Sequence, residues 1–499
     1  MSTEISNLQP QRVWHYFAEI CNVPRPSKKE GKIVKYLLDF AAMHKLEVMT
    51  DDVDNVLIRK PATKGRENAH PVILQSHIDM VCEKNNDIVH DWDNDPIVPW
   101  VDGEWLRAKG TTLGADDGIG MAVQLALLDA TDIEHGPVEC LFTVDEETGL
   151  TGAFALKKGF LKGRILLNLD SEDEGQLFIG CAGGKDTVAT FKHQKHTTPA
   201  GHCGFRLSVS GLKGGHSGDD INKGRGNAVK VITRFLWNGA REYGLKLNYI
   251  KAGNLRNAIA REAYAIIALP EEQKDHFINF CDKLTRDITA EFKVNDSGLT
   301  ISITPAALPA NVIDSTAQHE LLLALCACPH GVISMTPDMP GLVETSTNLA
   351  SVKMKGSHED EASDDDIRTM GDDEIRIATS QRSSLESGKK DVVDMVDSVF
   401  MLAGARTAHN DGYPGWSPNT KSQILEITRK SYKKLFGNDP EVLVIHAGLE
   451  CGLIGEKYPG MDMISYGPTL RGVHSPDECI NIPTVQRFWD LTLEILKSV

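Results

Sequence analysis

A short acidic segment, Thr143-Val144-Asp145-Glu146-Glu147-Thr148-Gly149, carries the residue types best suited to chemistry. An apolar run over residues 138–144 leads into it and predicts a buried strand. The strand would therefore end in two adjacent carboxylates. Because neighbouring side chains on an extended chain point in opposite directions, Glu146 and Glu147 are expected to do different jobs, one binding a metal and the other moving a proton. Taken alone, the segment fits a solvated acidic turn equally well.

Two histidines and two aspartates could complete a two-metal site with one of these glutamates. Imidazole and carboxylate groups suit zinc, cobalt or manganese. Two ions about 3.5–4 Å apart need a bridging carboxylate, and Asp116, in the glycine-rich loop 110–118, is the candidate for it. The five candidate ligands are His77, Asp116, Glu147, Asp170 and His474.

Each candidate also has a plain structural explanation. His77 could end a strand, Asp116 could cap a helix, and His474 could lie in a surface loop. Their joint placement near strand ends favours the metal site, because clustered acids repel one another without cations. Asp79, two residues after His77, could orient that histidine. Glu146 could take a proton from water and pass it to a leaving amine.

The order of elements predicts two domains. Strands alternate with helices in residues 1–186 and 415–499, which predicts a mostly parallel α/β sheet with helices on both faces. Sites in such sheets form beyond the carboxyl ends of the strands. Residues 187–414 instead show a β-α-β-β-α-β order, typical of a ferredoxin-like unit, and then a second lobe of similar elements. We therefore expect a discontinuous α/β domain with an inserted α+β domain.

Two polar segments receive local predictions. Ser27 and Glu30 match a capping box at the start of a helix. The very acidic segment 357–373 lacks the ligand spacing of a calcium loop, so it predicts a solvated hairpin insertion.

Composition narrows the class of protein. A chain of 499 residues predicts two or three domains. The net charge of −17 argues against a nucleic-acid surface. The ten cysteines are scattered, which favours buried free thiols in a reducing compartment over disulfides. With no secretory signal and no apolar run long enough for a membrane span, we expect a cytoplasmic protein.

The ordered motifs resemble the dinuclear zinc exopeptidases related to carboxypeptidase G and peptidase T, and the resemblance covers nearly the whole chain. The motifs are His77-x-Asp79, Gly114-Ala115-Asp116-Asp117-Gly118, Asp145-Glu146-Glu147-x-Gly149, Asp170, Gly214-Gly215-His216-Ser217-Gly218, His446-Ala447-Gly448-Leu449-Glu450 and Gly472-Val473-His474-Ser475-Pro476-Asp477.

The resemblance implies a role for each candidate residue of the α/β domain. One Zn2+ would be held by His77 and Asp170, and the other by Glu147 and His474. Asp116 would bridge the two ions. Glu146 would act as general base, and Asp79 would lie behind His77.

The resemblance also implies that the inserted domain is a lid that contributes to substrate binding and to dimerisation. His216 would bind the oxyanion of the tetrahedral intermediate. Asn257 and Arg382 would lie near the C-terminal carboxylate of the substrate. From chemistry and position alone, Glu450 could hold the free amino group of the substrate.

The implied activity is the hydrolysis of dipeptides of broad sequence, including those that end in histidine, by a metal-bridged hydroxide with Glu146 as base. A homodimer is implied as well. A tripeptidase or an N-acyl amino-acid deacylase of the same family is the alternative. A metal-free binding protein would leave the ligand set without a purpose, and a two-carboxylate glycosidase would leave the two histidines unexplained. The chain has no G-x-S-x-G nucleophile motif.

Overall fold

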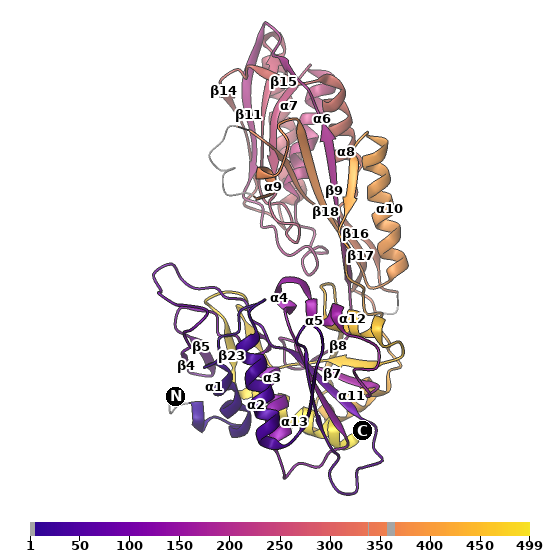
Figure 1. Cartoon of the computed structure of the whole chain (residues 1–499). Coiled ribbons are helices and arrows are strands. Elements are labelled where there is room, and N and C mark those ends of the chain that lie inside the picture. Colours follow the sequence, from indigo (N-terminus) through magenta and orange to yellow (C-terminus); the bar gives the residue numbers. More distant parts are fainter. Residues whose placement is uncertain (1–4, 338, 357–364) are drawn as a thin grey trace. The chain divides into compact units, whose positions relative to one another are not determined.

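The computed structural model describes residues 5–337, 339–356 and 365–499, and it divides into two compact units (Figure 1). Unit 1 comprises Met1–Cys181, Trp416–Val444 and Leu449–Val499. Unit 2 comprises Ala182–Gly415 and Ile445–Gly448. The segment predicted as an insertion, residues 187–414, lies within unit 2, which also takes four residues from the C-terminal part of the chain.

Unit 1 is a mixed α/β structure. In chain order its elements are η1 (Ile5–Asn7), α1 (Gln11–Ile20), α2 (Gly31–His44), β1 (Glu47–Thr50), β2 (Val56–Lys60), β3 (Val72–His77), β4 (Pro99–Asp102), β5 (Trp105–Ala108), α3 (Ala115–Asp129), β6 (Val138–Thr143), α4 (Glu146–Gly149), α5 (Thr151–Ala155), β7 (Ile165–Asn168), β8 (Gln176–Cys181), α11 (Gln423–Phe436), β20 (Glu441–Ile445), α12 (Glu450–Lys457), β21 (Asp462–Ser465), β22 (Leu470–Arg471), β23 (Cys479–Asn481) and α13 (Ile482–Ser498).

An eight-stranded sheet organises this unit, in the order β1-β2-β6-β3-β7-β21-β8-β20. The central strands β6, β3, β7 and β21 are parallel, and antiparallel pairs flank them. Helices cover both faces (Figure 1), which confirms the predicted fold class. Because β3, β6 and β7 run the same way, their carboxyl ends meet at one edge of the sheet.

Unit 2 is an α+β structure. In chain order its elements are β9 (Gly183–Lys192), β10 (Lys195–Thr197), β11 (His202–Ser210), α6 (Ala228–Glu242), β12 (Lys246–Ala252), β13 (Ala263–Pro270), η2 (Glu271–Gln273), α7 (Lys274–Phe292), β14 (Thr300–Ala306), β15 (Asn311–Ile313), α8 (Ser315–Ala327), β16 (Gly331–Met335), β17 (Val343–Met354), α9 (Asp365–Arg368), β18 (Glu374–Ser383), α10 (Glu386–Leu402) and β19 (Arg406–His409).

Two ferredoxin-like lobes share one long sheet in unit 2. The first lobe follows the predicted β-α-β-β-α-β order and pairs its strands as β14-β11-β13-β12. The second pairs β17-β18-β9-β19, and contact between β12 and β17 joins the two lobes. Helices α6, α7, α8 and α10 pack on the sheet, with Phe205, Phe235 and Phe400 in the shared core. The prediction of ferredoxin-like lobes is confirmed.

Several local predictions were wrong. Helix α2 begins at Gly31, and Glu30 is its N-cap without a side-chain bond, so Ser27 makes no capping box. The Ser27 hydroxyl instead donates to Asp79, and Glu30 accepts from the Asp145 amide. Ser27 thus binds a residue distant in the chain, and Glu30 accepts both the distant Asp145 amide and the local Lys28 amide.

The pair Glu146 and Glu147 also differs from expectation, because both open the short helix α4 rather than continue a strand. Asp145 before them has a φ of 49°, which turns the chain out of β6. Their side chains therefore diverge by the helical angle of about 100° per residue rather than by strand alternation.

Of the acidic segment 357–373, residues 357–364 lie outside the described part of the chain, and residues Asp365–Arg368 form α9. All ten cysteines are free thiols, and most are buried, as predicted. No helix within the described residues has the length and apolarity needed to cross a membrane.

Candidate functional site

The five candidate ligands converge at the carboxyl edge of the unit 1 sheet. His77 is the last residue of β3, and Asp170 follows β7. Glu147 lies on α4, directly beyond β6, and His474 lies in the loop between β22 and β23. Asp116 stands at the start of α3, where its backbone angles are not yet helical.

Asp116 lies between two histidines and offers each a different oxygen. Its Oδ1 is 3.0 Å from Nε2 of His77, which is also 3.5 Å from an oxygen of Asp170. Its Oδ2 is 3.1 Å from Nε2 of His474, which is 3.0 Å from an oxygen of Glu147. The site thus has two donor groups that share Asp116.

Both donor groups fit a metal ion. The ligand atoms of His77, Asp116 and Asp170 lie within 4.8 Å of one another, and so do those of Asp116, Glu147 and His474. One oxygen of Glu147, Oε1, is buried and has no hydrogen-bond partner among the described residues. Nitrogen and carboxylate donors in groups of three, with an unsatisfied buried oxygen, are the composition of a divalent metal site.

The protonation equilibria show how strongly these groups interact. Burial raises the pKa of Asp170 to about 7. Hydrogen bonds to Asp116 and Glu147 raise the pKa of His474 to about 11. Burial alone would lower the pKa of His77, but the surrounding carboxylates raise it well above its ordinary value. Burial and mutual repulsion thus disfavour the charged form of Asp170, whereas the two histidines lower the pKa of Asp116, so positive charge stabilises the carboxylates of this cluster.

The alternative role of Asp116 as a helix cap is wrong. The neighbouring residue Asp117 caps the helix instead, because its Oδ1 accepts the Gly120 amide at 3.0 Å in the first turn of α3. Asp116 is left to face the two histidines. His474 lies in a loop and its side chain is 49% exposed, but its Nε2 is within 3.1 Å of oxygens of both Asp116 and Glu147.

Asp79 lies behind His77, on the side away from the other ligands. Its Oδ1 is 3.4 Å from Nδ1 of His77. The Asp79 carboxylate also accepts the amides of Glu146 and Glu147 at 3.0 and 3.2 Å. One buried carboxylate thus faces the histidine ring and binds the first amides of α4; that it orients the ring stays a prediction.

Glu146 lies beside the ligands and within reach of them. Ligand atoms of His77, Glu146 and Glu147 lie within 4.8 Å of one another. Burial raises the pKa of Glu146 well above its ordinary value, and the charges of Asp170, Glu450 and Glu147 raise it further. A carboxyl group with this bias can accept a proton and give it back, which is what a general base and acid must do.

Glu450, the first residue of α12, is fully buried at the same edge. Its Oε2 accepts from Gln75 and Thr143, at 2.6 and 2.7 Å. Its Oε1 is buried and has no hydrogen-bond partner within the described ranges. Burial raises the pKa of Glu450 to about 7. That Glu450 holds a substrate amino group stays a prediction.

The other three candidate residues lie in unit 2. His216 forms a β-bridge with Ala258, and the Ser217 amide donates to the Asn257 carbonyl at 2.8 Å, so His216 and Asn257 lie on adjacent segments. Arg382 is buried on β18 and donates to the Tyr413 hydroxyl at 3.1 Å. Its Nε is buried without a hydrogen-bond partner among the residues described.

His446, a residue without a predicted role, also lies in unit 2. Its Nε2 is 2.7 Å from the hydroxyl of Ser346, and Ser346 pairs with Arg382 across β17 and β18. Directly paired residues share a face of the sheet, so the histidine lies on the Arg382 side. The motif 446–450 was the only sequence signal for it.

We expect His446 to stay neutral as the pH falls through 6.5, the ordinary value for histidine. Burial lowers its pKa to about 4, and the positive charge of Arg382 acts in the same direction. Histidine NMR during an acid titration would measure this, with His446→Asn identifying the signal. Protonation near pH 6.5 would contradict the expectation.

Comparison with known proteins agrees with this geometry. The model of the peptidase family M20/M25/M40 matches residues 73–498. The cytosol non-specific dipeptidase of Escherichia coli (strain K12) is 43% identical over 497 residues, which covers 100% of this chain and 99% of that protein.

Solved structures give the same result. The aminoacylhistidine dipeptidase of Vibrio alginolyticus has a TM-score of 0.90 and 45% identity, with 100% of this chain and 98% of that chain covered. The aminopeptidase PepT of Bacillus cereus shares the fold, with a TM-score of 0.61 and 16% identity over 98% of this chain and 99% of that one. Family model, full-length relative and structure agree, and the chain belongs to the peptidase family M20/M25/M40.

Proposed function

We propose that this protein is a metal-dependent dipeptidase of broad specificity that includes dipeptides ending in histidine. The observation that carries the proposal is the position of Asp116, which offers one oxygen to the His77 group and the other to the His474 group. The full-length similarity to two dipeptidases supports this substrate class over tripeptides and N-acyl amino acids.

The proposed ligands are His77 and Asp170 for one ion, Glu147 and His474 for the other, and Asp116 for both. Zn2+ suits this set best, with Co2+ or Mn2+ as substitutes. When bound, such a pair polarises the scissile carbonyl and lowers the pKa of water.

The residues of the chain supply the proton transfers and the orientation. Glu146 takes the proton of the attacking water and delivers it to the amine that leaves. Asp79 keeps Nε2 of His77 directed toward the ligands by facing its Nδ1. In unit 2, His216 is proposed to bind the oxyanion, and Asn257 and Arg382 the substrate carboxylate. Glu450 is proposed to recognise the amino group through its second oxygen.

Two further properties belong to the proposal. The name of the Escherichia coli relative supports a cytoplasmic location. A homodimer is proposed from the resemblance to lid-bearing exopeptidases, and sedimentation velocity of the full chain would test it.

Chelation should abolish dipeptide hydrolysis, and adding back zinc should restore it with about two metals per chain. Rates on dipeptides should exceed those on tripeptides and acetylated amino acids. Activity that survives full removal of metal would reject the metal mechanism. Preference for acetylated amino acids would replace the dipeptidase with a deacylase.

A further inference from the structure

Two buried charges, Arg25 and Glu478, lie on either side of the loop that carries Asp116. Their exposed fractions are 3% and 2%. Neither forms an ion pair among the described residues; both bind backbone groups instead. Burying a charge costs free energy unless the charged group is well hydrogen-bonded. The backbone groups around Arg25 and Glu478 must therefore supply those hydrogen bonds.

Glu478 gathers the amides of four successive residues. Its two oxygens accept the N–H groups of Leu113, Gly114, Ala115 and Asp116, at 2.7, 2.9, 2.7 and 3.3 Å. Successive backbone amides that converge in this way form an anion-binding nest. Glu478 follows His474 by four residues in the same loop. The carboxylate therefore ties the His474 segment to the Asp116 segment.

Arg25 binds backbone carbonyl groups, whereas Glu478 binds backbone amides. Its Nη1 donates to the carbonyls of Ile78 and Asp79, at 3.1 and 2.5 Å, and its Nη2 donates to the carbonyl of Gly114. The planar guanidinium holds its donors in a fixed fork, which sets the distance between the segments it joins. Arg25 therefore ties the His77 segment to the Asp116 segment.

The glycines of the Asp116 loop leave room for the guanidinium. A Cβ atom at Gly114 would lie 2.6 Å from Nη2 of Arg25 and 2.8 Å from the sulfur of Met80. A Cβ atom at Gly118 would lie 2.7 Å from the same nitrogen. Gly114 also has a φ of 68°, which disfavours other residues. The Gly-Ala-Asp-Asp-Gly motif is thus explained partly by the cation packed against it.

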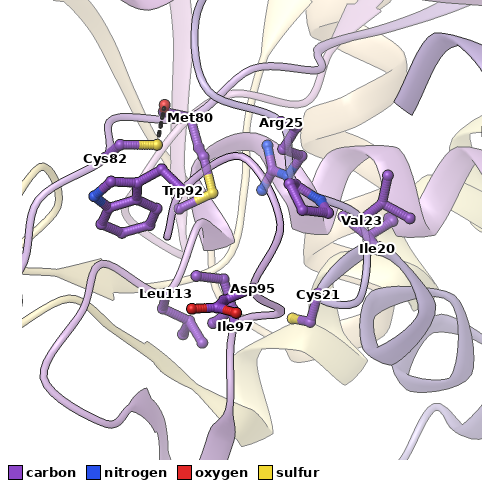
Figure 2. Close-up of a pocket in the computed structure, with 11 residues that line it drawn as sticks. Ile20, Cys21, Val23, Arg25, Met80, Cys82, Trp92, Asp95, Ile97 and Leu113 are labelled. Carbon is purple, nitrogen blue, oxygen red and sulfur yellow. Dashed lines mark hydrogen bonds between the residues drawn. The ribbon is translucent and has the colours of Figure 1, made fainter. Parts of the chain in front are cut away.

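Figure 2 shows the small cavity beside these loops, lined by Arg25, Met80 and Leu113 among others. Its volume is about 10 Å³, which holds at most one water molecule. The cavity is too small for a ligand of Arg25, whose hydrogen bonds go to the backbone carbonyls around it.

We propose that Arg25 and Glu478 are positioning residues that set the spacing of the segments bearing His77, Asp116 and His474, and so raise the affinity for both metal ions. The two act on opposite groups of one loop, since Gly114 gives its amide to Glu478 and its carbonyl to Arg25. This inference rests on the proposed two-metal function.

The test compares metal affinity with stability in Glu478→Gln, Arg25→Lys and a matched control. Glutamine keeps the shape of glutamate but directs an NH₂ group at amide donors, and lysine keeps the charge but loses the fork. The control is Glu139→Gln. Glu139 is a buried carboxylate that accepts two backbone amides at 2.8 Å, those of Lys162 and Gly163, and also binds Arg59. These partners in the described chain lie outside the segments that Arg25 and Glu478 join.

We expect Glu478→Gln and Arg25→Lys to weaken zinc binding about 10–100-fold in chelator competition on the metal-free protein. Absorption spectra with Co2+ should show altered coordination in both. Glu139→Gln should melt at a lower temperature but bind zinc as tightly as the unmodified chain. If Glu478→Gln does not fold, Glu478→Asp, which keeps the charge on a shorter side chain, takes its place with the same expectation.

Unchanged zinc affinity and cobalt spectra in both positioning variants would overturn the inference. Equal loss of affinity in Glu139→Gln would also overturn it, because the effect would then follow general destabilisation. An unmodified chain that binds no metal would reject the proposed function instead, so the two failures are distinguishable.

Discussion

Replacing Glu146 with glutamine is expected to lower kcat for dipeptides about 10²–10⁴-fold while both metal ions stay bound. The amide has nearly the same shape as the carboxylate but cannot take a proton. Glu146 lies within 4.8 Å of the proposed ligands His77 and Glu147. Burial raises its pKa well above the ordinary value, which is the direction expected for a carboxylate that must receive a proton. Kinetics together with elemental analysis of the purified variant measure both quantities.

The adjacent position supplies the matched control. Glu147→Gln should lose about one metal per chain, because an oxygen of Glu147 lies 3.0 Å from Nε2 of His474 and belongs with Asp116 and His474 to one candidate ligand group. Full turnover by Glu146→Gln would reject its role as base, and loss of a metal from that variant would make it a ligand. The two neighbours would then have exchanged the roles assigned to them.

Much of unit 1 could be predicted because the sequence patterns of its strands and helices depend on neighbouring residues alone. Strand β3 is buried along its whole length and β7 nearly so, and continuous apolar runs of this kind are typical of the centre of a parallel sheet. The rule that parallel strands share a carboxyl edge then brings His77 and Asp170 together without knowledge of contacts. In the first lobe of unit 2, whose strands are antiparallel, local patterns alone predicted the sequential order of strands and helices.

What could not be predicted depends on partners distant in the chain. Strands β4 and β5 form a four-stranded sheet with β22 and β23, more than 300 residues away. These strands are short, and polar and apolar residues do not alternate along them regularly enough to predict a strand. Ser27 matched a capping box by spacing, but its hydroxyl binds Asp79, 52 residues later. Local patterns describe only what a residue can do, and tertiary contacts decide which of these it does.

Arg25 and Glu478 were missed for a different reason. Their partners are backbone amides and carbonyls, which every residue has, so sequence types at the partner positions reveal nothing. Asp117 is a similar case, because either aspartate of the Asp116-Asp117 pair could cap α3 by spacing alone. The direction of each side chain, seen only in three dimensions, separates the capping residue from the one that faces the histidines.

Asp116→Ala is expected to empty both metal sites and abolish turnover, the largest effect of any single ligand. Each of its oxygens faces a different histidine, at 3.0 and 3.1 Å, so its loss removes one donor from each group at once. Asp170→Asn should weaken mainly zinc binding by the His77 group. Isothermal titration with zinc would count the sites and their affinities in each variant.

The comparison also tests whether the two sites are coupled. With a shared carboxylate, binding at one site fixes Asp116 for the other, so weakening the His77 group through Asp170→Asn should reduce affinity at the His474 group as well, by a smaller factor. A second site that binds zinc normally in Asp116→Ala would show that the two groups are independent. Asp116 would then be a ligand of one ion, and its role as a bridge between two ions would be rejected.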